Sequence, residues 1–298
     1  MDRDVASRIA AIGDVVSPET LDASRAVFAD AHEEPPYDGV VLTRDVAYGP
    51  HERHRLDLFA APGSHGLPVI LFVHGGGFVR GDKSTPGTPH NENVGLWASR
   101  SGMVGVTMNY RLAPEHRWPA GAQDVAAAVA WLRVHIAEHG GDPERIVLAG
   151  SSAGATHIAG YAAMPELHPG GEPGIRGLVL LSGAYDLPSF DDEAVLGPYF
   201  GDRSQWDAAS PLAGLVDSQL PVMVAVAEHD PPVSHRQAAI AFTALYERAG
   251  RVPHLVYVAG HNHFTEVFHL NTDDRLLGDQ IAAFVRTHAP ARERTEQV

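Results

Sequence analysis

A chain of 298 residues with 44% hydrophobic and 20% charged residues has the composition of a globular protein, and its length fits one large α/β domain. The formal net charge of −15 argues against nucleic acid and anionic membrane surfaces as partners, because both would be repelled. The sequence contains no cysteine, which excludes disulfides, thiolate catalysis and cysteine-ligated metals.

The amino terminus, "MDRDVASRIAAIGDVV", has no basic region followed by an apolar run and a cleavage site. No apolar run in the sequence reaches the length needed to span a membrane. We therefore expect a cytoplasmic protein without a membrane partner.

Short apolar runs alternate with longer segments of helical periodicity, which predicts a mostly parallel α/β fold. The inner runs are continuously apolar, as expected of strands that are covered on both faces. The first two runs are separated only by "GPHER" and could form an antiparallel edge. The predicted strands are 45–49, 54–60, 68–76, 103–111, 145–151, 177–184, 221–230 and 254–260.

Helical periodicity is clearest in 121–141, 234–250 and 272–289, and a further helix is predicted after "SPETL". Two segments do not follow the alternation of strands and helices. They are residues 1 to about 40, and the aromatic, turn-rich segment 188–215, which has no clear strand. We predict a single domain over 1–298, with these two segments forming a small cap and pocket wall.

The stretch "VLAGSSAGATHIAGY" places two serines between an apolar run and a helical run. A nucleophilic serine must be raised on a tight turn, which requires small residues two positions before and after it. Gly150 and Gly154 satisfy this requirement for Ser152, whereas Ser151 would be flanked by two alanines. We therefore predict Ser152 as the nucleophile; a glycine-rich helix start capped by serine is the structural alternative.

The run "VILFVHGGGFVRGDK" places three glycines after a predicted strand. Acyl transfer passes through a tetrahedral oxyanion, which is stabilised by backbone N–H groups that can approach it closely. We predict Gly76, Gly77 and Ala153 as these donors, and expect His74 to hold the loop by hydrogen bonding. A phosphate-binding loop is disfavoured because the lysine and hydroxyl residue that close such loops are missing at the positions that the motif requires.

The catalytic acid and base should follow late strands, in the order serine, acid, histidine. Asp230, at the end of "PVMVAVAEHD", is the predicted acid, with Asp186 as the rival and Glu228 expected to point away. "GHNHF" offers two histidines after the last strand, of which we prefer His263 and keep His261 open. A His-x-His metal pair is the other interpretation, but no third ligand is suggested, so no metal is predicted.

The motifs "HGGGF", "YRLAPEHRWPAGAQDV", "GSSAG", "AEHDPP" and "GHNHF" resemble, in order and spacing, the hormone-sensitive-lipase-like branch of the α/β-hydrolases, a group of bacterial carboxylesterases. The resemblance implies an α/β-hydrolase fold with an eight-stranded, mostly parallel sheet flanked by helices. It also implies a cap built partly from the amino terminus, no cofactor, and hydrolysis of short-chain acyl esters. Ser151 and Ala155 depart from the acidic residue and glycine usual there, and "HNHF" looks closer to aryl formamidases of the kynurenine formamidase kind.

The leading prediction is a serine carboxylesterase that acts on small uncharged or weakly polar esters through an acyl-enzyme intermediate. An amidase or aryl formamidase is the second enzymatic possibility, and a non-catalytic binding protein on the same fold is the third. The partner would be a small-molecule ester or amide, with a homodimer possible. The aromatic residues predicted to line the substrate pocket are Phe78, Trp118, Tyr199, Phe200 and Trp206.

Overall fold

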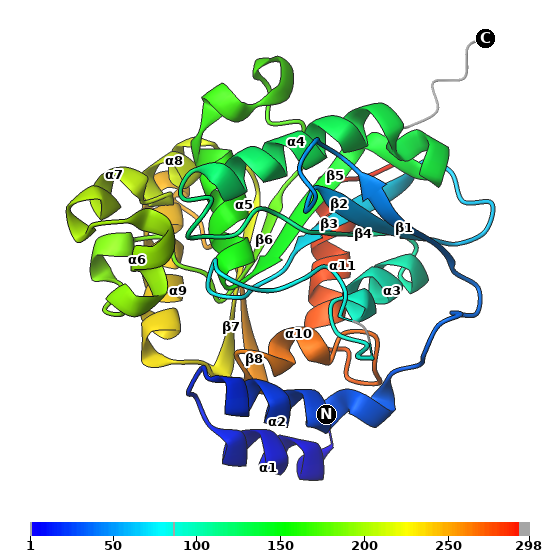
Figure 1. Cartoon of the computed structure of the whole chain (residues 1–298), viewed down its shortest axis with the longest axis horizontal. Helices are drawn as coiled ribbons and strands as arrows, with labels where there is room; N and C mark the ends of the chain where they lie inside the picture. The colour runs from blue at the N-terminus through cyan, green and yellow to red at the C-terminus, as the bar shows by residue number, and fades with distance from the viewer. Residues whose placement is uncertain (1, 86, 292–298) are drawn as a thin grey trace.

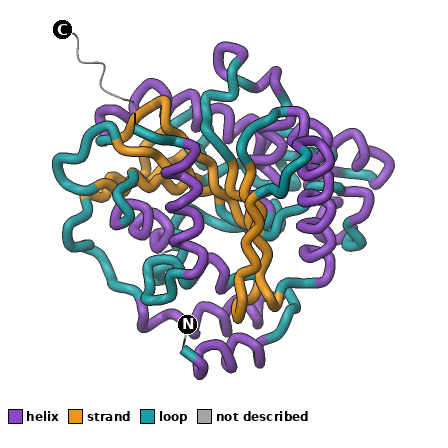
Figure 2. Tube along the Cα trace, turned by 180° about the vertical axis from the view of Figure 1, so that it is seen from behind, coloured by secondary structure: helices purple, strands orange, loops and turns teal. Residues whose placement is uncertain are grey.

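The computed structural model describes residues 2–85 and 87–291 and contains one eight-stranded sheet, with strands in the order β1-β2-β4-β3-β5-β6-β7-β8 (Figures 1 and 2). The continuously apolar inner runs form its central strands, as the sequence predicts. The strands are β1 (Val41–Ala47), β2 (Arg55–Ala60), β3 (Leu67–Val73), β4 (Val104–Met108), β5 (Gly141–Ser151), β6 (Leu178–Leu181), β7 (Val222–His229) and β8 (His254–Asn262).

The adjacent strands β4, β3, β5, β6, β7 and β8 are parallel, whereas β2 is antiparallel to both β1 and β4. The predicted antiparallel edge is therefore confirmed. The first strand begins four residues earlier than predicted, at Val41, and ends at Ala47. Its pairing with β2 shifts register between Thr43 and Val46, where Asp45 has a φ of 55°. This irregularity hid the strand's alternation in the sequence.

Helices cover both faces of the sheet (Figure 1). In chain order, the α-helices are α1 (Arg3–Ile12), α2 (Pro18–Phe28), α3 (Glu92–Arg100), α4 (Ala120–His135), α5 (Ala153–Ala163), α6 (Glu193–Phe200), α7 (Trp206–Ala209), α8 (Leu212–Asp217), α9 (Pro232–Ala249), α10 (Thr265–Phe268) and α11 (Leu276–His288). Along β3 the side chains alternate, so that Val69 and Leu71 join the core beneath α4, α5 and α9, while Ile70 and Phe72 join the core beneath α3 and α11. Short 3-10 helices are Ala29–Ala31, Ile136–His139, Pro165–Leu167, Pro169–Gly171, Leu187–Ser189 and Arg203–Gln205.

The two segments outside the alternation are helical. The helices α1 and α2 lie together at one end of the molecule (Figure 1), and α1 contacts β8. Ser17 caps α2 through a capping box. The segment 188–215 contains α6 and α7 and the start of α8, and Asp192 caps α6 by accepting two backbone N–H groups. Among the described residues, no helix is both long and apolar enough to cross a membrane.

The parallel strands bring the chemistry-bearing segments to one edge of the sheet. Because β3, β5, β6, β7 and β8 run in the same direction, the residues that follow their carboxyl ends converge. The glycine loop follows β3, Ser152 follows β5, and Asp230 and His263 follow the last two strands. This edge is where a site is expected in an open parallel sheet.

Candidate active site

Ser152 occupies a sharp turn between a strand and a helix. It lies between the end of β5 and the start of α5, with φ 54° and ψ −119°. A non-glycine residue at such a positive φ is strained, and the surrounding structure must hold it there. The side chain is half-buried and lines a cavity of about 590 Å³.

The glycines that flank Ser152 leave no room for a side chain. A Cβ added to Gly150 would lie 2.6 Å from the backbone carbonyl carbon of Gly154. A Cβ added to Gly154 would lie 2.6 Å from the carbonyl carbon of Val73 and still closer to its oxygen. The steric argument that distinguishes Ser152 from Ser151 therefore holds in the structure.

The glycine loop after β3 lies beside this turn. Gly76 and Gly77 have φ values of 134° and 59°, and a Cβ added to Gly75 would lie 3.2 Å from the Cβ of Ser152. Within the part of the chain that the structure describes, no hydrogen bond uses the backbone N–H of Gly76, Gly77 or Ala153. All three residues line the cavity, so their N–H groups can serve a bound oxyanion.

His74 holds the glycine loop, as the sequence predicts. Its Nδ1 lies 2.7 Å from the carbonyl oxygen of Gly75, and its ring stacks on Tyr110 at 4.4 Å between centroids. Burial lowers the pKa of His74 to about 4, so the ring is neutral near pH 7. A neutral, fully buried imidazole suits a structural role here.

His263 and Asp230 form a buried pair at the ends of β8 and β7. The imidazole Nδ1–H donates to Asp230 Oδ1 over 2.6 Å, which fixes the tautomer and leaves Nε2 as the basic nitrogen. Asp230 Oδ2 accepts hydrogen bonds from the Ser182 hydroxyl at 2.5 Å and the Ala227 N–H at 2.7 Å. The carboxylate is therefore held on both oxygens.

The rival residues lie elsewhere. His261 is fully buried and its ring packs at 4.0 Å from that of His269, with Nε2 3.4 Å from Asp274 Oδ2. Glu228 points to the surface, where it accepts the Gly260 N–H. Among the described residues, Asp186 makes no hydrogen bond to His263. The imidazole of His263 pairs with Asp230 instead.

Ser152 and His263 face the same cavity, although no hydrogen bond joins them in the described structure. Catalytic hydrogen bonds are often long in unliganded enzymes and shorten when substrate binds. The cavity thus brings together the hydroxyl, the imidazole and the three amide groups that the sequence predicts.

The predicted aromatic pocket wall needs correction. Phe78 lines the cavity, but Trp118, Tyr199, Phe200 and Trp206 do not. Tyr199 and Phe200 pack against Phe78 from behind, with ring centroids 4.9 and 5.3 Å away, and Trp206 is fully buried in the same cluster. Trp118 is 38% exposed. The prediction failed because a large aromatic residue near a pocket more often builds the layer behind its wall.

Two buried residues of the site were not found from the sequence. Ser182 follows β6 and has a φ of 50°, and Glu266 lies in α10, three residues after His263. The Ser182 hydroxyl lies between Asp230 and Glu266. Neither residue belongs to a motif whose spacing alone predicts a role, although a serine at positive φ after a strand is a structural signal of constraint.

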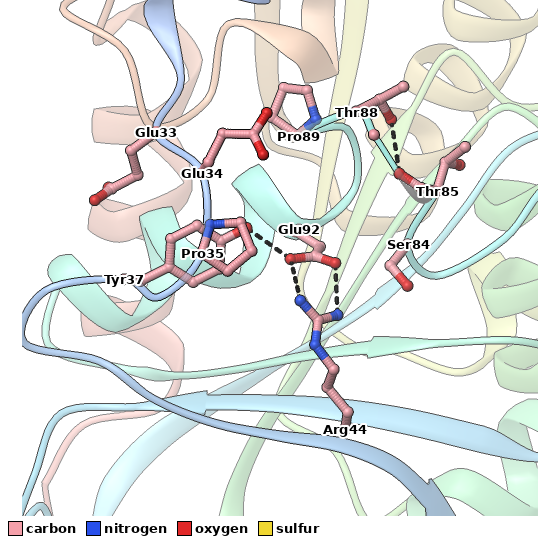
Figure 3. Close-up of a pocket in the computed structure, with 11 residues that line it drawn as sticks. Glu33, Glu34, Pro35, Tyr37, Arg44, Ser84, Thr85, Thr88, Pro89 and Glu92 are labelled. Carbon is pink, nitrogen blue, oxygen red and sulfur yellow. Dashed lines mark hydrogen bonds and ion pairs between the residues drawn. The ribbon is translucent and has the colours of Figure 1, made fainter.

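Among the described residues, two clusters could hold a metal ion. One is Asp230, His263 and Glu266, which is the acid–base pair with its neighbour. The other is His261, His269 and Asp274, so the two histidines of the His-x-His pair fall in different clusters. A second pocket of about 260 Å³ does not include Ser152. In it, Glu92 accepts hydrogen bonds from the two Nη groups of the Arg44 guanidinium and from the Tyr37 hydroxyl (Figure 3).

The sheet order, the strained serine turn and the histidine after the last strand together define the α/β-hydrolase fold. The chain belongs to the α/β-hydrolase fold family, whose sequence model matches residues 70–267. It is 32% identical to the esterase LipQ of Mycobacterium tuberculosis over 70% of this chain and 53% of that protein. It is 38% identical to the carboxylesterase NlhH of the same species over 43% of this chain and 40% of that protein.

The chain thus spans about half the length of these curated relatives. Among solved structures, a thermostable esterase from Pseudomonas putida ECU1011 matches with a TM-score of 0.73 and 23% identity, over 98% of both chains. At this identity the match establishes the fold.

Proposed function

We propose that this protein is a serine hydrolase that cleaves small carboxylic esters through an acyl-enzyme intermediate. The observation that carries the proposal is the convergence on one cavity of the strained Ser152, the His263–Asp230 pair and three backbone N–H groups without protein acceptors in the described structure. The similarity to an esterase and a carboxylesterase supports the same reaction class.

The residues would divide the reaction as follows. The Ser152 hydroxyl attacks the ester carbonyl while His263 Nε2 accepts its proton, and the N–H groups of Gly76, Gly77 and Ala153 donate to the oxyanion. Collapse of the tetrahedral intermediate breaks the bond to the alcohol, which takes the proton from His263. Water then attacks the acyl group by the same route, releasing the acid and regenerating the serine hydroxyl. Asp230 would keep Nδ1 protonated and stabilise the imidazolium.

The cavity suggests the substrate class. Its volume of about 590 Å³ suits a small ester, and much of its lining is apolar. Apolar lining residues include Phe78, Phe190, Val195, Leu196, Phe264 and Val267. These side chains favour short aliphatic or aromatic acyl and alkyl groups over charged ones.

Replacing the nucleophile is the direct test. Ser152→Ala should lower kcat by roughly 10³-fold or more, because the attacking oxygen is lost while the fold is kept. Labelling by a fluorophosphonate and hydrolysis of p-nitrophenyl butyrate measure this effect. Ser151→Ala is the matched control and should retain labelling and most turnover. Equal activity of Ser152→Ala and the native protein would refute the proposal.

Amide hydrolysis is separable by substrate. Comparing N-formylkynurenine with p-nitrophenyl butyrate tests the aryl formamidase alternative, which predicts the higher kcat/KM for the formamide. We expect the ester to be preferred. A native protein that fails to react with the fluorophosphonate would instead favour a non-catalytic binding role.

The segments 1–40 and 188–215 are proposed as cap elements of a single domain spanning 1–298. Val15 and Leu21 from the first segment and Val195 and Leu196 from the second line the cavity. A cytoplasmic location and a homodimer stay predictions, which cell fractionation and light scattering would test.

A further inference from the structure

A second carboxyl group is buried behind the acid–base pair. Glu266 has no exposed surface, and its Oε2 lies 3.0 Å from the Ser182 hydroxyl oxygen. Its other oxygen, Oε1, has no hydrogen-bond partner in the described structure. An ionised carboxylate left in this state would carry a large desolvation cost without a compensating donor.

The hydroxyl between the two carboxyl groups has only one proton to give. Ser182 Oγ lies 2.5 Å from Asp230 Oδ2 and 3.0 Å from Glu266 Oε2. Asp230 is the acceptor in the shorter bond, and it is also the carboxylate that His263 requires. The 3.0 Å contact is then a hydrogen bond only if Glu266 carries a proton and donates it to Ser182.

The charges around Glu266 act in the same direction. Asp230 and His263 face it from the ends of β7 and β8, and one ligand atom of each of the three residues lies within 4.8 Å of the others. Ser182 and the buried Tyr185 face it from the segment after β6. Burial, followed by the charge of Asp230, raises the pKa of Glu266 well above its usual value. A hydrogen bond donated by Ser182 would lower this pKa, but the Ser182 proton is donated to Asp230 in the shorter bond.

We propose that Glu266 is a positioning residue that stays protonated at neutral pH and acts through the chain Glu266–Ser182–Asp230–His263. Donation by the Glu266 carboxyl polarises the Ser182 hydroxyl, which strengthens its own hydrogen bond to Asp230 Oδ2. Asp230 is thereby fixed with Oδ1 toward the imidazole. The catalytic role of these hydrogen bonds rests on the proposed ester hydrolysis, but the protonation state of Glu266 does not.

The proton state can be measured without any turnover. At neutral pH, the infrared difference spectrum of native protein minus Glu266→Gln should contain the carbonyl band of a protonated carboxylic acid. Glu92→Gln is the matched control, because Glu92 is also buried but is held by the Arg44 guanidinium (Figure 3). Its difference spectrum should show a carboxylate band instead. A carboxylate band for Glu266 would overturn the proposal, whether or not the protein hydrolyses esters.

Kinetics then test the positioning role. Glu266→Gln keeps a neutral donor to Ser182 and should change kcat by less than about threefold, whereas Glu266→Leu removes the donor and should lower kcat by about tenfold with little change in KM. A residue that merely fills space would be replaced equally well by leucine. The pH at which kcat/KM falls on the acid side should be unchanged in Glu266→Gln.

Two kinetic outcomes would contradict the proposal. In Glu266→Gln, the pH at which kcat/KM falls on the acid side could shift downward by about one pH unit. Such a shift would mean that a negative charge near His263 had been removed. Equal kcat values in the glutamine and leucine variants would mean that the donor is irrelevant. Should the leucine variant not fold, the glutamine variant and the infrared spectrum still decide the question. Absence of ester hydrolysis in the native protein, with the acid band present, would instead be a failure of the proposed function alone.

Discussion

Gly154, two residues after the proposed nucleophile, lies against the backbone of the neighbouring strand β3. An added Cβ would overlap the carbonyl group of Val73, and the backbone of a strand that is paired on both sides cannot move aside as a flexible side chain can. Gly160, in the same helix, is different, because an added Cβ would meet only the Ala122 Cβ at 3.6 Å. The two glycines therefore provide a matched pair.

Gly154→Ala should lower the free energy of unfolding by about 3 kcal/mol or more, because the turn must open to admit the methyl group. Gly160→Ala should raise it by about 0.5–1 kcal/mol, as expected for alanine in a helix interior. Urea unfolding followed by circular dichroism measures both. An unchanged stability of Gly154→Ala would show that the turn is not tightly packed.

Among single residues, the local sequence pattern predicts part of the site. The Ser152 turn and the glycine loop were predictable because small residues are required at fixed positions within a few residues. Ser182 and Glu266 were not, because their roles depend on three strand ends meeting in space. The sequence favours His263 without excluding His261, whereas in the structure Asp230 lies beside Nδ1 of His263.

Among the elements, the strands were easier to predict than the cap helices. The buried runs from 68 to 260 are long, apolar and rich in β-branched residues, so their local pattern agrees with their place in the sheet. The helix α6 contains Pro198, and α7 has only four residues, so neither shows a helical period. These helices form because their apolar residues pack around Leu196 and Trp206, a tertiary effect.

The helix α6 should set how long a substrate the cavity accepts. Val195 lines the cavity from this helix, and Val195→Phe would add a ring to that wall. We expect KM to rise about tenfold for the longest members of an acyl or alcohol series, with little change for an acetate of a short alcohol. Val134, on α4, is 70% exposed, so Val134→Phe is the control and should leave KM unchanged for short and long esters alike. Equal effects on short and long esters would argue against α6 as a cavity wall.

For the whole molecule, four buried histidines make the free energy of unfolding depend on pH. Burial lowers the pKa of His74 to about 4 and the pKa values of His90, His157 and His269 to about 3. These histidines are neutral in the folded protein, and regain an ordinary affinity for protons when the chain unfolds. Between about pH 4 and 6.5 the unfolded chain therefore binds more protons than the folded one, so their contribution to stability is present above pH 6.5 and lost as the pH falls. Glu266, with its raised pKa, contributes in the opposite sense, because its burial costs stability as the pH rises above about 4.5.

His157 allows this linkage to be isolated. Its ring is enclosed by Phe78, Tyr110 and Tyr199, with centroids 4.5 to 5.3 Å away, so phenylalanine can occupy the same aromatic site. The native protein should lose stability between pH 7 and pH 5, and His157→Phe should lose about 2 kcal/mol less, since one buried group no longer gains a proton on unfolding. Urea unfolding of both proteins at the two pH values measures the difference, in which the contributions of Glu266 and the other histidines cancel. Parallel losses in the two proteins would show that His157 takes up its proton without unfolding, and hence that this part of the core admits charge.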